Sequence, residues 1–307
     1  MRNGEVEDRP EPERIMPSVE RRIDRVHGVA YRGATSQVQQ KWTVVAADDY
    51  AATTPFLMLS EDRFAAPGGF ETHPHRGMQT VTFVLDGALE HRDHTGAHSI
   101  LRPGDVQWMT AGSGVLHSEM PHGTEAVHTL QLWLNLPARL KMIPAGYVDQ
   151  RLDNIPRRRE AGMEVRVYAG RSGDFSHPHG SVWPSTLLDL RIEADRTLVQ
   201  DLPGAQRGFL YVLEGSARLG MGGVVVSARQ VAWFDPTADG TVDFLTIAAE
   251  ENVRALLFAA PPIDEPIAFG GPFVMNTAEE IRQAYADFLD GRFIGQGAAP
   301  PTPASFD

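Results

Sequence analysis

The chain has 307 residues, no cysteine and a formal net charge of -12, from 28 Lys and Arg against 40 Asp and Glu. The length suggests about two domains at ~150 residues each, large enough to fold around apolar cores. Disulfides, thiolate catalysis and zinc–thiolate sites are excluded, and an acidic chain without a basic stripe predicts no direct nucleic-acid binding.

Residues 1–17 are charged and contain prolines, so we expect a disordered N-terminal tail. They lack the apolar core of a secretory signal, and no apolar run reaches the ~18 residues that a membrane span needs. We therefore expect a soluble, cytoplasmic protein that does not enter a membrane. His27 stands alone before the richest histidine stretch and is interpreted as a surface or turn residue.

Short strand-like segments follow, beginning near Lys41, Pro55, Gln79 and Val127. Each is rich in β-branched or aromatic residues and is bounded by turn residues. Asp86-Gly87 between two apolar runs predicts a hairpin. Short strands at intervals of about ten residues, joined by glycine turns, predict an all-β barrel or sandwich.

Residues 137–160 contain prolines, helix-like pieces and the basic run Arg157 to Arg159, so we interpret them as a linker with a solvated face. A second β-rich segment covers 163–261. A helix is predicted from Asn276, with Asn276 or Thr277 as its cap. Its predicted apolar stripe consists of Ile281, Tyr285, Phe288 and Leu289. Residues 296–307 read as a disordered tail.

The two β-rich segments resemble each other. FVLDG at Phe83 matches YVLEG at Tyr211, and downstream GDVQWM with Trp108 matches RQVAWF with Trp233. The order of the matches is the same in both halves. We infer two copies of one small barrel, assigned to residues 18–150 and 151–295, with the C-terminal helix in the second.

The first copy carries two pairs of possible metal ligands, His73 with His75 and His117 with Glu119. Residues i and i+2 of a strand point to the same face, so two facing strands would offer three imidazoles and one carboxylate. That donor set suits a divalent transition metal better than magnesium or calcium. At the matching counts the second copy has Asp201, Pro203, Val242 and Phe244. One metal site, in the first half, is predicted.

The remaining histidines are interpreted without a role in the metal site. His177-Pro178-His179 repeats the His-Pro-His text but has no downstream partner pair, so we expect a loop. His91, His94 and His98 occupy a charged stretch around a Thr-Gly turn and are predicted to be surface residues. His122 and His128 have no partner at ligand spacing.

With these residues in place, the chain resembles the pirin family of the cupin superfamily. The motifs that carry the resemblance are HPHRGMQTVTFVLDG, GDVQWMTAGSGVLHSEMP and GPFVMNTAEEIRQA. They imply an all-β fold of two tandem cupin barrels with a C-terminal helix, and a metal in the N-terminal barrel only. They also imply that His73, His75, His117 and Glu119 are the ligands.

For this family the resemblance implies iron, so Fe(II) is the expected metal, with zinc, manganese, nickel, copper and cobalt as alternatives. One departure is Gln79, where many pirins carry Glu. We expect this change to leave metal binding intact and to alter polarity and hydrogen bonding beside the site.

Three functional interpretations stay open. The chain could be a dioxygenase of the quercetin 2,3-dioxygenase type, with a flavonol-like substrate and Glu119 as the base that removes a substrate hydroxyl proton. It could instead be an iron- and redox-responsive regulatory protein that binds a transcription factor or a metabolic enzyme. In the third interpretation it acts on another small substrate. We expect a monomer in each case.

Overall fold

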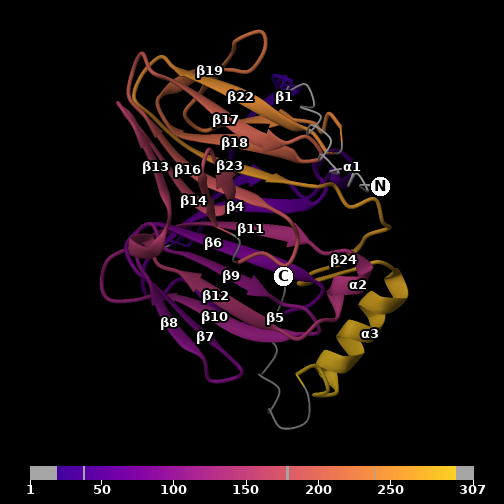
Figure 1. Ribbon diagram of the computed structural model, residues 1–307. Helices are drawn as coiled ribbons and strands as arrows, with labels where there is room; N and C mark the ends of the chain where they lie inside the picture. The colour runs from indigo at the N-terminus through magenta and orange to yellow at the C-terminus, as the bar shows by residue number, and fades with distance from the viewer. Residues whose placement is uncertain (1–18, 37–38, 178–179, 239, 295–307) are drawn as a thin grey trace, which may run out of the picture.

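The computed structural model describes residues 19–36, 39–177, 180–238 and 240–294. The chain forms two β-rich halves, one above the other in Figure 1, with the helices at one side. Each half consists of a large sheet facing a four-stranded sheet, as in a jelly roll, so the predicted all-β fold in two similar halves is confirmed. The two tails predicted to be disordered lie outside the described residues.

In the first half the large sheet has seven strands. Its order is β12 (Gly146–Gln150), β9 (Val106–Thr110), β6 (Met78–Asp86), β11 (Val127–Asn135), β4 (Phe56–Phe64), β3 (Gln39–Val45) and β2 (Ala30–Ser36). The facing sheet has the order β5 (Phe70–His75), β10 (Val115–Pro121), β7 (Leu89–Asp93) and β8 (His98–Leu101). The segments predicted from Lys41, Pro55, Gln79 and Val127 are strands β3, β4, β6 and β11.

The second half repeats this arrangement. Its large sheet has the order β1 (Arg25–Gly28), β21 (Gln230–Phe234), β18 (Arg207–Glu214), β23 (Val253–Ala260), β16 (Thr186–Ile192), β14 (Met163–Ser172) and β13 (Arg157–Glu160), and β15 (Phe175–His177) pairs with β14. Its facing sheet has the order β17 (Thr197–Pro203), β22 (Val242–Ala249), β19 (Ser216–Leu219) and β20 (Val224–Ser227). The matched Phe83 and Tyr211 lie in equivalent strands, as do Trp108 and Trp233.

The halves exchange one strand each. β1 precedes all the strands of the first half but pairs with β21 of the second, with Arg25 opposite Trp233. β12 comes just before the strands of the second half but pairs with β9 of the first, with Val148 opposite Trp108. Each half is therefore completed by a strand that comes from the segment preceding the other half.

Two sequence interpretations are wrong. Asp86-Gly87 does not form a hairpin, because β6 and β7 lie in different sheets and Gly87 turns the corner between them with a positive φ of 72°. A Cβ at Gly87 would lie 2.4 Å from the Ala126 carbonyl oxygen, so the close approach also requires glycine. The supposed linker is structured, since it contains α2 (Ala138–Lys141), β12, η1 (Leu152–Asn154) and β13, and Arg157 to Arg159 belong to β13.

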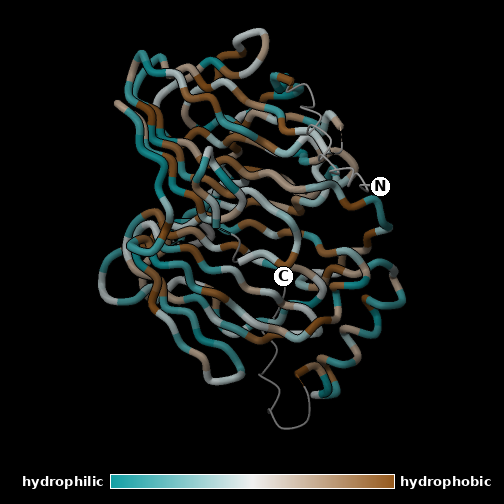
Figure 2. The backbone as a smooth tube through the Cα atoms, in the orientation of Figure 1, coloured by the Kyte–Doolittle hydropathy of each residue, from teal (hydrophilic) through white to brown (hydrophobic). Residues whose placement is uncertain are grey.

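The largest buried cluster lies between the two large sheets. It joins residues of both halves, and the rings of Phe56 and Phe209 pack edge to face with centroids 5.1 Å apart. A second cluster fills the interior of the second half. Figure 2 shows hydrophobic stretches recurring along the strands of both halves. Nonpolar burial of this extent, at roughly 25 cal/mol per Å², holds the halves together.

The interior of the first half is more polar. Along β4, Leu59 belongs to the cluster between the halves, while Ser60 and Asp62 are buried on alternate positions. Because side chains alternate along a strand, these two residues face the barrel interior. Thr82, Thr129 and Gln107 are also buried polar residues of this half. The first half thus has a polar interior suited to a site.

In the described residues the sheets are accompanied by the α-helices α1 (Tyr50–Thr53), α2 and α3 (Ala278–Leu289). The predicted C-terminal helix is confirmed as α3, with Thr277 and Glu280 forming a capping box. Ile281 is buried as predicted, whereas Leu289 is 70% exposed and does not belong to the stripe. No helix in the described part of the chain is long and apolar enough to cross a membrane.

Helix α3 packs on the first half although its sequence follows the second. It lies beside β5 in Figure 1, and Ile281 shares a buried cluster with Leu116 of β10. The strands β24 (Ala268–Gly270) and β25 (Phe273–Met275) connect it to the rest of the chain. Phe273 makes a bridge with Arg76, the residue that follows β5. The C-terminal segment therefore supports the strand that carries His73 and His75.

Candidate metal centre

Three of the predicted ligands meet. His73 and His75 lie on β5 and His117 on β10, and His73 is directly opposite His117 in the antiparallel pair. One ring nitrogen from each of the three histidines can be chosen so that these nitrogens all lie within 4.8 Å of one another. The ring centroids of His73 and His117 are 4.4 Å apart. The i, i+2 spacing in the sequence therefore predicts the geometry correctly.

Burial keeps these imidazoles neutral. Desolvation lowers the pKa of His73, and it lowers the pKa of His75 and of His117 well below the usual value. Neighbouring imidazoles lower the pKa of His75 and His117 further, because two cations at this separation repel each other. Neutral imidazole is the form that binds a metal ion.

Backbone carbonyls fix which ring nitrogen is free. His73 Nδ1 lies 2.7 Å from the Glu71 carbonyl oxygen, and His75 Nδ1 lies 3.2 Å from that of Pro272. A carbonyl only accepts, so in both rings Nδ1 carries the proton and Nε2 presents a lone pair. This is the usual second-sphere arrangement of metal-binding histidines.

The buried nitrogens also lack partners. Nε2 of His75 and Nε2 of His117 are buried and form no hydrogen bond. Such an atom costs about 1–3 kcal/mol when it is left unpaired. Two of them converge beside a third imidazole, and a metal ion bound between them would satisfy both. The residues present therefore fit a divalent transition metal.

Glu119 is buried close to this group but is not part of the set within 4.8 Å. A bulge in the pairing between His117 and Glu119 interrupts the regular strand alternation. Its Oε2 accepts from Gln131 Nε2 at 2.7 Å and its Oε1 from Thr82 Oγ1 at 3.1 Å. Desolvation raises the pKa of Glu119 to about 7. Its role as fourth ligand stays a prediction.

Gln131 and Trp133 are site residues that the sequence reading missed. Trp133 Nε1 donates to Gln131 Oε1 at 3.1 Å, so the amide nitrogen of Gln131 is left to donate to Glu119. Both residues alternate with Leu130, Leu132 and Leu134 along β11. Since those leucines face the cluster between the halves, the alternation would have placed Gln131 and Trp133 inside the barrel.

An open pocket of about 430 Å³ leads to His73 and His75. Phe70 and Trp133 give it two aromatic walls, and the Trp133 ring packs edge to face on His75 with centroids 4.9 Å apart. Polar and charged groups at the pocket are those of Lys41, Ser60, Glu71 and Gln131. The pocket has the mixed apolar and polar lining of a small-molecule site.

The other histidines are partly as predicted. His98 and His122 are exposed and His94 is half-buried. His27 lies in β1 and His177 in β15, while His179 lies outside the described residues. His128 hydrogen-bonds to Glu61 at 2.9 Å. The prediction for His91 is wrong, because its side chain is fully buried and its Nε2 lies 3.1 Å from His117 Nδ1.

Comparisons with known proteins agree with this arrangement. The pirin family model matches residues 26–134, and the model of the pirin C-terminal cupin domain matches residues 187–294. A Pseudomonas aeruginosa relative, named as a candidate quercetin 2,3-dioxygenase, is 42% identical over 249 residues, or 77% of this chain and 86% of the relative. The chain belongs to the pirin family.

Solved structures show the same fold. The GK1651 protein of Geobacillus kaustophilus superposes with a TM-score of 0.78 at 41% identity, covering 81% of this chain and all of that one. A quercetin 2,3-dioxygenase from Acinetobacter baumannii superposes with a TM-score of 0.80 at 29% identity, covering 90% and 99% of the two chains.

In this pirin-family chain, Gln79 serves the contact between the halves. Its Nε2 donates to Thr110 Oγ1 at 2.8 Å and to the Gly180 carbonyl at 3.3 Å, and its Oε1 accepts from Ser181 Oγ at 3.0 Å. Gly180 and Ser181 belong to the second half. The glutamine is thus engaged in hydrogen bonds away from Glu119, which accepts from Gln131 and Thr82.

In the second half the sequence count of the positions equivalent to the ligands is displaced by one residue. Asp201, Val242 and Phe244 are at least partly exposed, whereas the alternate positions are buried. The inward positions are Gln200, Leu202, Asp243 and Leu245. Asp243 is paired with the buried Arg21, whose Nε lies 3.1 Å from its Oδ2. Within the described ranges, the three-histidine group is the one set that could hold a metal.

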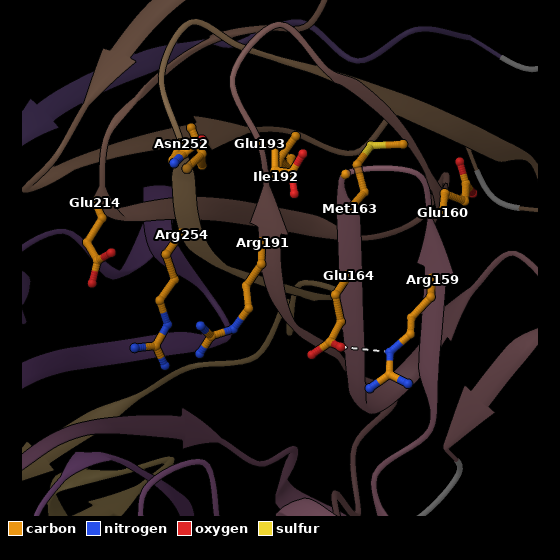
Figure 3. A pocket seen from close by; sticks show the side chains of 12 residues that line it. Arg159, Glu160, Met163, Glu164, Arg191, Ile192, Glu193, Glu214, Asn252 and Arg254 are labelled. Carbon is orange, nitrogen blue, oxygen red and sulfur yellow. Dashed lines mark hydrogen bonds and ion pairs between the residues drawn. The ribbon is translucent and has the colours of Figure 1, made fainter.

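Another hollow, of about 450 Å³, lies on the second half (Figure 3). Figure 3 shows Arg191 and Arg254 side by side, and a dashed line joins Glu164 to Arg159. Both Arg191 and Arg254 also approach the buried Asp189, at 3.5 and 3.4 Å. These charges neutralise one another on a sheet surface, so we assign the hollow no chemistry.

Proposed function

We propose that this pirin-family protein is a divalent-metal-dependent dioxygenase of the quercetin 2,3-dioxygenase type, with Fe(II) as its metal and a flavonol-like substrate. The observation that carries the proposal is the convergence of His73, His75 and His117, with two unpaired Nε2 atoms, at an aromatic-walled pocket. The names of the Pseudomonas and Acinetobacter proteins support the reaction class.

The three histidines would hold the metal through Nε2, and we propose Glu119 as the fourth ligand. When bound, the metal supplies Lewis acidity and a template for the substrate oxygens. Three or four protein ligands leave positions open on a six-coordinate ion, as chemistry requires.

The chain's own residues handle the substrate and its proton. Phe70 and Trp133 offer apolar walls for a flat aromatic ring and exclude water from it. We propose the buried Glu119 as the base that takes the proton of the substrate hydroxyl. Gln131 and Thr82 hold the two carboxylate oxygens in place, so that the carboxylate does not have to reorient.

The test is a single-turnover experiment with quercetin. The protein is loaded with Fe(II) without oxygen, quercetin is added, and oxygen is then admitted. We expect carbon monoxide and the ring-opened depside in equal amounts, and a loss of both products in His75→Ala. Turnover at background level with each of Fe(II), Mn(II), Co(II), Ni(II), Cu(II) and Zn(II) would contradict the proposed reaction, while chelator competition reports separately on the metal centre.

A further inference from the structure

His91 is buried in the first half, as His75 and His117 are. It lies on β7, opposite Glu119 of β10, and its side chain has no exposed surface. Because directly opposite residues of an antiparallel pair share a face, His91 points to the same interior as Glu119. Its Nε2 lies 3.1 Å from Nδ1 of His117, the ligand two residues before Glu119.

The direction of this hydrogen bond follows from the free nitrogen of His117. His117 Nε2 is buried and unpaired beside the other two ligands, so it is the atom that would bind the metal. A neutral imidazole that offers Nε2 as a lone pair carries its proton on Nδ1. His117 therefore donates, and His91 Nε2 accepts.

The two other ligands are oriented by the backbone, since His73 donates to Glu71 and His75 to Pro272. His117 depends on a side chain for the same purpose. Outer-sphere acceptors of this kind fix the tautomer and the orientation of the ligand ring. Among these three histidines, His117 is thus the one whose support can be removed by a single substitution.

We propose that His91 is a positioning residue of the metal centre, which holds His117 in the Nδ1-protonated tautomer with Nε2 directed at the ion. The inference rests on the proposed metal site. His91 is not itself assigned as a ligand, because it lies outside the three-histidine group. Its Nε2 accepts from His117, so in the neutral ring the buried Nδ1 carries the proton and offers no lone pair to a metal. Its ring packs instead near Tyr147 of β12, with centroids 5.4 Å apart.

The experiment compares cobalt(II) binding by the full chain and three variants, by chelator competition and by the visible spectrum of the bound ion. His91→Phe keeps an aromatic ring but cannot accept a hydrogen bond. His91→Gln places an amide that can accept near the position of Nε2. His98→Phe is the matched control, because His98 is exposed on the neighbouring strand β8 and contacts Glu90.

We expect His91→Phe to bind cobalt about 10- to 100-fold more weakly and to change its spectrum, as when an outer-sphere partner is lost. His91→Gln should recover most of the affinity, and His98→Phe should match the parent. If His91→Phe does not fold in its metal-free form, His91→Leu replaces it as the smaller non-accepting variant.

The outcomes separate the two claims. A parent chain that does not bind cobalt overturns the proposed metal centre and this inference with it. A parent that binds, with a non-accepting variant of equal affinity and unchanged spectrum, overturns only the role of His91. An equal loss in His91→Gln and His91→Phe would also reject it, because the accepting group would then not be what matters.

Discussion

Burial shifts the pKa of Glu119 and the pKa values of the histidines around it in opposite directions. Desolvation disfavours charge, so it raises the pKa of Glu119 to about 7 and lowers that of His75 and His117. In the metal-free protein just below neutral pH, the imidazoles are therefore ready to bind a cation while the carboxyl holds a proton. If Glu119 is a ligand, the metal must displace that proton.

This gives a pH dependence with a definite sign. Below about pH 7 the affinity for metal should increase about tenfold for each unit by which the pH is raised, since one proton is released on binding. Above about pH 7 the affinity should level off. In Glu119→Gln the slope should disappear and the affinity should be lower throughout. Chelator competition between about pH 5.5 and about pH 8.5 measures both. An unchanged slope in Glu119→Gln would show that another group releases the proton.

How far the sequence predicts the site depends on what each residue looks like in isolation. His73, His75 and His117 stand out because histidine pairs at strand spacing are easily read, and the structure confirms that they meet. The charged run EHRDH wrongly predicts an exposed His91, although Leu89, two positions earlier on β7, is buried and lies on the same face. Gln131 is marked only by its alternation with the neighbouring leucines, which gives its face but not its hydrogen bond to Glu119.

At the scale of elements, the C-terminal segment acts as a brace for the ligand strand. The carbonyl of Pro272 accepts from His75, and Arg76 Nη1 reaches Asp287 of α3 at 2.8 Å. The Arg76 guanidinium also lies over the Phe293 ring, 4.4 Å from its centroid. The cap at Asn276 or Thr277 and the apolar stripe predict the helix itself, but only the tertiary structure shows which half it packs on.

Phe273 tests the brace. It is fully buried and its ring contacts those of Tyr285 and Phe293, so Phe273→Ala should lower the free energy of unfolding by about 3–5 kcal/mol. It should also weaken metal binding, because the neighbouring Pro272 orients His75. Leu289→Ala on the same helix should change stability by less than about 0.5 kcal/mol, since Leu289 is exposed. Denaturant unfolding and chelator competition provide the two readouts, and undiminished affinity in Phe273→Ala would argue against the brace.

Lys141, at the end of α2, joins this brace to the first barrel. Its buried ammonium donates to the carbonyls of Gly77 and Val274, at 2.9 and 3.1 Å, and to Asn135 Oδ1 at 2.7 Å. Replacing it with Met should cost about 2–4 kcal/mol, because buried acceptors lose their donor. Burial lowers the pKa of Lys141 from 10.5 to about 8.

The lowered pKa of Lys141 predicts how the stability difference between the parent and Lys141→Met depends on pH. Between about pH 8 and about pH 10.5 the unfolded chain binds more protons at this lysine than the folded protein does. Its contribution to stability is therefore complete above about pH 10.5, declines as the pH falls from there, and is lost once the pH has fallen through about 8. The stability gap between the parent and Lys141→Met should widen as the pH is raised across this window. Denaturant titrations at several pH values measure it, and a gap that narrows would refute the assigned shift.

For the whole molecule, the internal repeat predicted two similar barrels but not how they are joined. The halves exchange β1 and β12, and this exchange depends on strand pairing over long sequence distances, which no local pattern encodes. The apolar cluster between the large sheets also holds the halves together, and the Tyr211 hydroxyl of the second half donates to Glu61 of the first. Each half needs the other to complete a sheet and to cover an apolar face.

The two halves should consequently unfold as one unit. Saturating metal at the proposed site in the first half should raise the melting temperature of the entire chain in a single calorimetric transition, because binding at about 1,000 times Kd adds ~4 kcal/mol to the folded state. Tyr211→Phe, which leaves the buried Glu61 with one donor fewer, should lower that single transition in both metal-free and metal-bound protein. Two transitions, of which metal shifts only one, would show that the halves fold independently and that the exchanged strands contribute little to their coupling.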